Sequence, residues 1–396
     1  MGAALALLVA CALGAPDLEA RAALRAEVSE RRYDPEEGDA RRTDQLLLHP
    51  DLQADLVGPD ARLGLAYRPR IAFIKTAGLP DQREVLHDGA ARLTLLAARP
   101  WRITLEATGA LGRTDLVTQF RPGTGGGGTG GGTGGEPPPV VTTTSVVDYQ
   151  NASLILSLAG PAGRASDLSL DLTAHTDGGA TAEARQSMPT QRTAEARALW
   201  IRRITPRDGV ELRADALWAE LPDLDTRSAT GTGVLTWTHR FSRTWDGRAG
   251  AGAVGGWFDL ADETTSDVYP AGELGLSHRS ADLRAGQDLR VRLGAGIDRL
   301  TGEVAPEQTF ELTARWRLGE SFGLSALVAG GLAQQELGDT RRGNAEVRGT
   351  WEVHRLVELD LGLFGQAQRA NRITLPSFDE WGAYLGATLR TPVGVW

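Results

Sequence analysis

The sequence predicts an all-β protein, an antiparallel β-barrel that crosses a membrane. Three observations support this: strict two-residue alternation, connections of alternating length, and aromatic residues at strand ends. From Trp101 to Thr108 every odd position is apolar and every even position is polar or charged. Successive side chains of a strand point to opposite faces, so one face is apolar and the other is wet. Such segments recur from Leu63 to Leu389, which is typical of a barrel with an apolar wall and a polar lumen.

Length and composition agree with this fold class. The chain has 396 residues, of which 41% are hydrophobic, and 49 are glycine. That length is enough for one large barrel. After the N-terminus no run of about 20 apolar residues occurs, which excludes a polytopic helical membrane protein. The net charge is -9 and the arginines are scattered singly, which argues against a nucleic-acid partner.

Residues 1–15 form a short apolar stretch that ends in small residues and is signal-peptide-like, although it has no basic n-region. Ala12-Leu13-Gly14 is a candidate cleavage site. Leu8-Val9-Ala10-Cys11 also resembles a lipoprotein signal, so two outcomes stay open: Cys11 leaves with the signal, or it carries a lipid. Cys11 is the single cysteine, so no intrachain disulfide can form.

Residues 16–60 are predicted to form a periplasmic N-terminal extension. The part up to residue 45 is rich in Arg, Glu, Asp and Ala, and Ala20, Leu24 and Val28 recur at helical spacing. We therefore expect a short, marginal helix there. Residues 46–58 fit either an extra strand or a lead-in to the barrel.

The barrel itself is predicted over residues 61–396, with about sixteen strands and a range of about 14–18. The expected strands are 63–74, 86–98, 101–111, 148–159, 167–176, 191–202, 209–219, 230–242, 247–258, 267–278, 288–298, 308–318, 321–332, 343–353, 356–367 and 380–391.

Short and long connections alternate along these strands. Short ones lie at 99–100, 160–163, 205–208, 319–320 and 354–355, and longer polar ones lie between them. Bacterial barrels have short periplasmic turns and long external loops, so an even strand number places both termini in the periplasm. The longest connection contains a Gly-rich tract at 121–139, which cannot bury a core. It is predicted to be a solvated external loop, with flanks that extend a hairpin or fold into the lumen.

Tryptophans lie on the apolar parity near both ends of the strands. Trp101, Trp200, Trp316 and Trp351 are near short turns, and Trp218, Trp257 and Trp381 are near long loops. This placement predicts two interfacial aromatic girdles. A soluble β-sandwich, the alternative fold, requires neither girdles nor such regular loop asymmetry.

Charged residues on the polar parity are predicted to line a pore. Arg290 and Arg292 share one strand and Arg315 and Arg317 the next, so pairing around the loop near 303 predicts one cationic patch that favours anions. Glu106 and Asp171 are expected roughly across the ring, and Arg348, Glu358 and Asp360 form a mixed set. Opposed charges tune the passage of polar solutes. A wall whose charges pair internally, without selectivity, remains an alternative.

The sequence predicts no catalytic residue, metal site or cofactor. His175 shares a polar face with Ser169 and Asp171, but a hydrolase also requires a placed nucleophile and an oxyanion donor. Phosphate-binding, metal-binding and dinucleotide motifs do not occur. A barrel-embedded hydrolase of lipids or peptides and a structural or adhesive surface barrel are the rival functions.

Residues 60–396 resemble the outer-membrane porin-like barrels of Gram-negative bacteria. The resemblance lies in the alternation, the loop asymmetry, the girdles and the terminal aromatic Trp396, although Pro392 and Gly394 interrupt the alternation just before it. More loosely, AYRPRIAF (66–73), VLHDGAARLTL (85–95) and VDYQNASLILSL (147–158) resemble barrels associated with exopolysaccharide export.

The resemblance implies an outer-membrane channel for a hydrophilic solute or polymer, with secreted exopolysaccharide as the specific expectation. Conduction is passive, and no enzyme chemistry is expected. The implied partners are outer-membrane lipid and lipopolysaccharide, the barrel assembly machinery and periplasmic export components.

Overall fold

In the computed structural model the chain forms one antiparallel sheet of twenty strands. The structure describes residues 17–36, 39–98, 100–115, 146–260, 263–297, 302–334, 339–370, 377–391 and 394–395. The strands are β1 (Asp17–Pro35), β2 (Arg41–Val57), β3 (Ala61–Tyr67), β4 (Arg70–Thr76), β5 (Gln82–Ala98), β6 (Trp101–Asp115), β7 (Val146–Pro161), β8 (Ser166–Gly179), β9 (Gln191–Arg203), β10 (Asp208–Leu221), β11 (Thr226–Arg240), β12 (Trp245–Leu260), β13 (Glu263–Arg279), β14 (Ala285–Ile297), β15 (Val304–Arg317), β16 (Phe322–Ala333), β17 (Thr340–His354), β18 (Val357–Ala370), β19 (Phe378–Arg390) and β20 (Gly394–Val395). A short helix, α3 (Ala182–Ser187), and a 3-10 turn, η1 (Pro222–Leu224), lie in connections.

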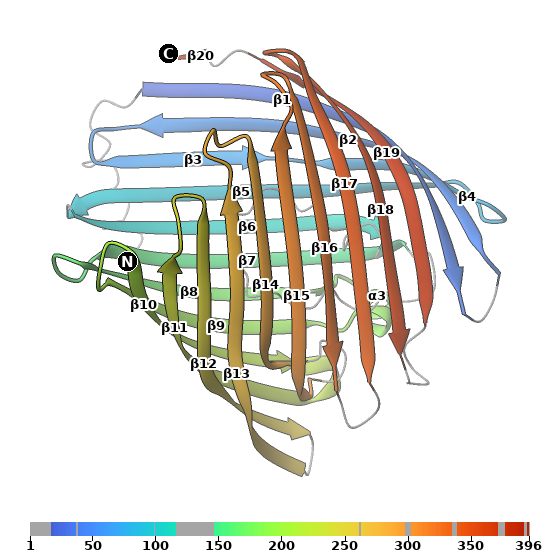
Figure 1. The fold of residues 1–396 in the computed structure, drawn as a ribbon. Coiled ribbons are helices and arrows are strands. Elements are labelled where there is room, and N and C mark those ends of the chain that lie inside the picture. Colours follow the sequence, from blue (N-terminus) through green and yellow to red (C-terminus); the bar gives the residue numbers. More distant parts are fainter. Residues whose placement is uncertain are drawn as a thin grey trace, which may run out of the picture.

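The sheet closes into a barrel because β1 pairs with β19 along most of its length (Figure 1). Neighbours in sequence pair with each other around the ring, so the meander has no crossover. Closure leaves no free sheet edge, which a strand in lipid cannot tolerate.

The barrel has eighteen strands, whereas the sequence predicts about sixteen. β3 and β4 are two halves of one strand, since both pair with β2 on one side and β5 on the other. The break falls at Arg68-Pro69, where proline supplies no N–H to the ladder. The two-residue β20 only extends the pairing of β1. Each of the sixteen predicted segments overlaps a strand, and the two additional strands are β1 and β2.

The predicted N-terminal extension is therefore wrong, because residues 17–57 form β1 and β2 within the barrel. The helical interpretation rested on Ala20, Leu24 and Val28, which are four residues apart. A spacing of four keeps side chains on one face of a helix and also on one face of a strand. Alanines at the intervening even positions weaken the alternation of β1, and this weak contrast concealed the strand.

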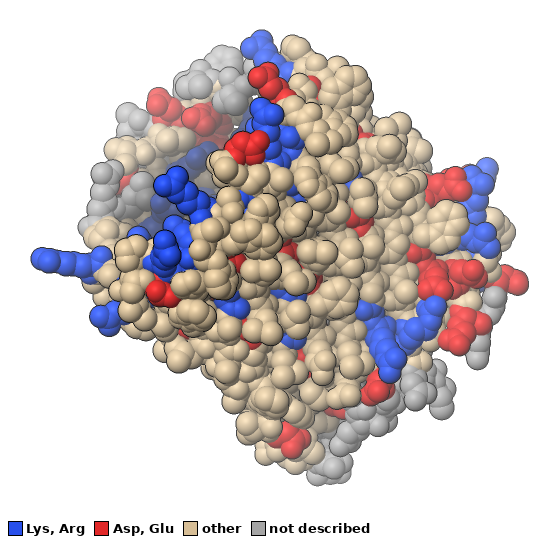
Figure 2. All heavy atoms as spheres, viewed as in Figure 1, with Lys and Arg blue, Asp and Glu red and all other residues tan. Residues whose placement is uncertain are grey.

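The outer wall is apolar, as the alternation predicts. On β14, Leu289, Val291 and Leu293 point outward and are 42%, 44% and 38% exposed, while the residues between them are polar. Charged side chains gather at the two ends of the barrel, and a broad uncharged band separates them (Figure 2). This band is the surface that a bilayer would cover.

Two of the predicted girdle members at opposite ends of the wall are strongly exposed: Trp381 at 55% and Trp351 at 51%. Trp218 is 39% exposed, and Trp101 packs over Gly160, where a Cβ would lie 2.5 Å from the indole. The other three, Trp200, Trp257 and Trp316, lie within β9, β12 and β15. Trp237 and Trp245 are also outward-facing and exposed, at 48% and 38%, and were not among the predicted members.

Among the described residues, no helix is long and apolar enough to span a membrane. The signal-like segment with Cys11, the Gly-rich tract at 121–139 and Trp396 lie outside the described residues.

Inside the barrel, the ring of Tyr384 on β19 lies over Gly362 on β18. A Cβ on Gly362 would come within 2.3 Å of the ring, and the Tyr384 hydroxyl donates a 2.7 Å hydrogen bond to Glu346 on β17. Glycine at position 362 thus leaves room for the Tyr384 side chain, which links β17, β18 and β19.

We expect Gly362→Ala to displace Tyr384 and to lower the stability of the folded barrel by about 1–3 kcal/mol, the usual cost of overpacking. The measurement is the temperature at which the heat-modifiable band disappears on a gel. Gly294→Ala on β14 is the control, because a Cβ there meets nothing within 4 Å. Equal melting temperatures for both variants would show that Tyr384 moves at no cost.

Candidate functional site

The polar parity of the strands forms the wall of a charged lumen. On β14 this parity carries Asp288, Arg290 and Arg292, and on β15 it carries Glu311 and Arg315. Because strand residues alternate, the side chains that avoid the apolar outer wall all meet inside the barrel. The lumen is therefore the candidate functional site.

The structure brings together the predicted set Arg348, Glu358 and Asp360, and adds Arg25 from β1. The Asp360 carboxylate is fully buried and lies 2.9 Å from the Arg25 guanidinium and 3.6 Å from that of Arg348. Arg348 also lies 3.9 Å from Glu358, and Arg390 lies 2.5 Å from the same carboxylate. Burial of charge is tolerated here because each carboxylate has two cationic partners.

Sequence reasoning missed Arg25 and Arg390. Arg25 was assigned to the extension, and its partner Asp360 is 335 residues away in sequence. The alternation of β1 places Arg25, Glu27 and Arg31 on one parity, which was the available signal.

A second ion-pair network, absent from the predicted site, spans β9 to β13. Arg197 lies 3.0 Å from Asp215, Arg213 lies 2.9 Å from Asp215 and 3.7 Å from Glu273, and Arg248 lies 3.7 Å from Glu273. Thr236 donates a 3.0 Å hydrogen bond to Glu273. These residues share the polar parity of adjacent strands, so the same alternation could have identified them.

The four predicted arginines form two pairs along the wall and not one tight patch. Arg290 is registered opposite Glu311, Arg292 opposite Thr309, and Arg315 opposite Gly286. Arg290 and Arg315 are therefore offset by four residues, or roughly 13 Å along the strands. The prediction of a single cluster failed because it required a different register from the one that pairs Ile297 of β14 with Val304 of β15.

The arginines nevertheless border two hollows that share Arg290 and Glu311 in their linings. Arg290, Arg315 and Arg317 line a hollow of about 830 Å³ near the short turns, together with Glu311. Arg290 and Arg292 line a narrower hollow of about 190 Å³ toward the long loops, with Glu307 and Arg342. We call the five residues Arg292, Arg342, Arg290, Arg315 and Arg317 the arginine track.

Glu106 and Asp171 lie on β6 and β8, on the part of the ring opposite β14 and β15. Glu106 forms a close ion pair with Arg92. Asp171 is registered opposite Arg197 on β9. Arg92 reduces the charge that Glu106 presents to the arginine track across the lumen.

Long connections fold inward and narrow the lumen at one end. Ala184 of α3 and Met188 after it pack against Leu86 and Tyr149 on the inner wall. Gly302, before β15, approaches β11 so closely that a Cβ would lie 2.5 Å from Thr226 Cγ2, and its carbonyl accepts a short hydrogen bond from Ser228. Its φ of +77° is a second reason for glycine at this position.

His175, the one histidine considered for catalysis, lies 3.3 Å from the buried carboxylate of Asp177. In the described part of the chain, no group of three or more His, Cys, Asp or Glu side chains could hold a metal ion.

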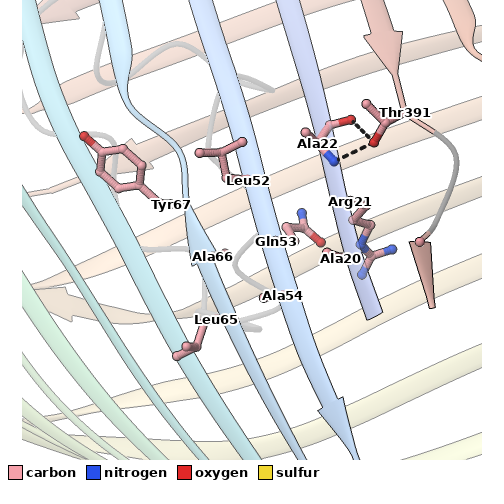
Figure 3. Close-up of a pocket in the computed structure, with 11 residues that line it drawn as sticks. Ala20, Arg21, Ala22, Leu52, Gln53, Ala54, Leu65, Ala66, Tyr67 and Thr391 are labelled. Carbon is pink, nitrogen blue, oxygen red and sulfur yellow. Dashed lines mark hydrogen bonds between the residues drawn. The ribbon is translucent and has the colours of Figure 1, made fainter. Parts of the chain in front are cut away.

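A further hollow, of about 550 Å³, lies on the outer wall between β1, β2 and β3 (Figure 3). Alanines at positions 20, 22 and 54 alternate there with larger neighbours such as Leu52, Leu65 and Tyr67. At this hollow, the Thr391 hydroxyl accepts a hydrogen bond from the backbone N–H of Ala22 and donates one to the Ala22 carbonyl (Figure 3). Its apolar lining and outward position identify it as part of the lipid-facing surface and not of the lumen.

Comparison with solved structures identifies the fold. OccK2 (OpdF) from Pseudomonas aeruginosa is similar over 94% of this chain and 98% of its own, with 12% identity and a TM-score of 0.50. OccK2 in complex with glucuronate covers the same shares at 11% identity and a TM-score of 0.50. The outer-membrane protein OpdK from P. aeruginosa matches over 95% of this chain and 99% of its own, at 12% identity and a TM-score of 0.49.

No family profile and no curated protein sequence matches the chain. The structural likeness confirms the resemblance to Gram-negative outer-membrane porin-like barrels at the level of the fold. Together with the apolar outer wall, this fold assigns the chain to the bacterial outer membrane.

We expect Asp360→Ala to destabilise the barrel by about 1–3 kcal/mol, because Arg25 and Arg348 lose a buried carboxylate but keep some solvent and their other partners. The measurement is the urea midpoint of tryptophan fluorescence in detergent micelles. Asp171→Ala, an inward carboxylate with no ion pair among the described residues, should shift the unfolding free energy by less than about 0.5 kcal/mol. Indistinguishable midpoints would mean that the desolvation cost of burying the Asp360 carboxylate equals the stabilisation from its ion pairs.

Proposed function

We propose that this barrel is a passive channel that admits small hydrophilic solutes and favours anions. The observation that carries the proposal is the arginine track in a closed barrel. Side chains of Arg290 and Arg315 are exposed to the lumen, and neither has an ion-pair partner within the described residues. Exposed guanidinium groups in a low-dielectric enclosure raise the local potential and concentrate anions.

Carboxylates along the arginine track reduce this preference. Glu311 faces Arg290 across the ladder, and Glu358 is engaged by Arg348 and Arg390. The hollow near the short turns is lined by five arginines and by five carboxylates: Asp288, Glu311, Glu320, Glu352 and Glu358. The remaining excess of positive charge lies in the narrower hollow, where Arg290, Arg292 and Arg342 face Glu307 and Glu311. Modest anion selectivity is the expected consequence.

The narrow interior supports small solutes. Two ion-pair networks occupy the wall, and connections near α3 and Gly302 fold inward, so the smaller hollow holds only about 190 Å³. A sugar acid is a suitable probe, since OccK2 has been crystallised with glucuronate and a carboxylate accepts paired hydrogen bonds from arginine.

The rival functions have less support. The comparisons give no support for exopolysaccharide export. Its only basis is the set of short sequence resemblances in the first third of the barrel. A hydrolase built on His175 and its partner Asp177 would also require a nucleophile and an oxyanion donor placed beside the imidazole. Of the similar solved structures, OpdK is named as an outer-membrane protein.

We expect Arg290→Glu/Arg315→Glu to abolish anion preference or reverse it, because the two changes shift the charge of the hollow by four units. At the ~8 Å screening length of physiological salt, ions inside the hollow feel most of that change. The measurement is the reversal potential of purified protein in a planar bilayer across a KCl gradient. Arg227→Glu/Arg369→Glu, the same charge change on the outer wall, should leave it unaltered. If the first variant also leaves it unaltered, the arginine track lies outside the conducting path.

We further expect the wild-type barrel in proteoliposomes to admit glucuronate, and Arg290→Glu/Arg315→Glu to slow that entry by about tenfold, the equivalent of about 1.4 kcal/mol. Entry of uncharged xylose should change by less than about twofold, because the lumen is no narrower. Liposome swelling measures both rates. Equal slowing of the two sugars would indicate a blocked pore and would contradict electrostatic selection.

A further inference from the structure

The outer wall formed by β1, β2, β4 and β5 changes from apolar to charged across a single row. Val28, Leu46 and Phe73 are outward-facing cross-strand neighbours and are 59%, 39% and 41% exposed. Moving along these strands toward the β1–β2 and β4–β5 connections, the next outward positions are Glu30, Asp44 and Lys75. This row therefore marks the edge of the lipid-facing band on that side of the barrel.

Four outward-facing cations lie at this edge: Arg83 at the end of the apolar row, and Lys75, Arg32 and Arg42 beyond it. Arg32 is registered opposite Arg42, Lys75 opposite Asp44, and Arg83 opposite Phe73. The guanidinium of Arg42 is engaged by Glu30 at 3.0 Å and Asp44 at 3.3 Å. Strands β1, β2, β4 and β5 lie side by side (Figure 1), so these groups share one surface.

Three of these cations, Arg32, Lys75 and Arg83, define what we call the outer cationic patch. Each is exposed, and among the described residues no carboxylate lies within ion-pairing distance of any of them. The Arg83 guanidinium lies over the Phe73 ring, with its central carbon 5.6 Å from the ring centroid. Like charges on one surface repel, so an anion from outside the chain would stabilise this patch.

Most cations elsewhere at this edge of the outer wall have their own carboxylates, although Arg341 on β17 is exposed and has no ion-pair partner among the described residues. Arg113 lies 3.6 Å from Asp148, Arg192 and Arg227 lie 3.5 Å and 3.6 Å from Glu220, and Arg369 lies 2.7 Å from Asp379. The uncompensated charge is thus concentrated on β1, β4 and β5, with Arg341 on β17 as a further case.

We propose that the outer cationic patch binds the phosphate groups of a phosphorylated glycolipid of the external leaflet, namely lipopolysaccharide. A ligand here must be anionic at the level of the patch and apolar beside Val28, Leu46 and Phe73. A glycolipid meets both demands at once, with its phosphates on the cations and its acyl chains on the apolar row. Arginine forks and a lysine ammonium are well suited to phosphate oxygens. The proposal rests on the outer-membrane orientation and not on conduction.

Lys75 is the single lysine of the chain, which makes the patch directly measurable. Folded protein in detergent micelles is acetylated with an N-hydroxysuccinimide ester, and the rate at Lys75 is read by peptide mass spectrometry. Diphosphoryl lipid A should slow acetylation as its concentration rises, whereas dephosphorylated lipid A at the same concentrations should not. The titration gives an apparent affinity.

Arg32→Ala/Arg83→Ala should weaken that affinity by roughly thirty-fold, from the usual contribution of each cation near an anionic surface. Arg192→Ala/Arg227→Ala, which removes two compensated cations on the far side of the ring, should leave it unchanged. Heat-modifiability on a gel verifies folding of both variants, and bilayer conductance of Arg32→Ala/Arg83→Ala should match the wild type.

Equal protection by both lipids would mean that acyl chains alone shield the amine, and would overturn the proposal. Unchanged affinity in Arg32→Ala/Arg83→Ala would do the same. Protection in native outer membranes that purified lipid A cannot reproduce would point to a protein neighbour instead. None of these outcomes depends on whether the barrel conducts, so the channel proposal stands or fails separately.

Discussion

The rest of the structure depends on the requirement that every backbone N–H and C=O in lipid be paired. A sheet meets it only when its first and last strands join, and here β1 joins β19 from Ala23–Arg390 to Pro35–Phe378. Closure makes the strand number even and places both described ends of the sheet, β1 and β20, beside each other. It also separates two solvents: lipid outside and water inside. The alternation of side chains follows from that separation.

The same closure concentrates charge in the lumen. Side chains of one parity from eighteen strands converge there, so each arginine meets carboxylates from strands remote in sequence. Asp360 shows the consequence: it is fully buried, yet it lies between Arg25 and Arg348. Pairing of this kind occupies most of the wall with rigid networks. The exposed arginines of the track are the residues left to interact with a solute.

The two faces of the wall meet different solvents and treat charge differently. Inside, charge is compensated by neighbouring strands, with the arginine track as the exception. Outside, the apolar row of Val28, Leu46 and Phe73 ends at charged positions, with the outer cationic patch as the exception. We propose the same explanation for both exceptions: the balancing charge comes from outside the chain, from a passing solute in the lumen and from a membrane lipid on the outer wall.

The sequence alone determined the face that each strand residue takes, because alternation is a local property of an extended chain. It therefore predicted the sixteen later strands, the aromatic ends such as Trp351 and Trp381, and the inward side of Arg290 and Arg348. Tertiary structure alone decided the partners. Register placed Arg290 opposite Glu311, roughly 13 Å from Arg315 along the strands, and closure brought Arg25 to Asp360 across 335 residues. β1 escaped prediction because its spacing of four fits helix and strand alike, and only pairing with β2 and β19 distinguishes them.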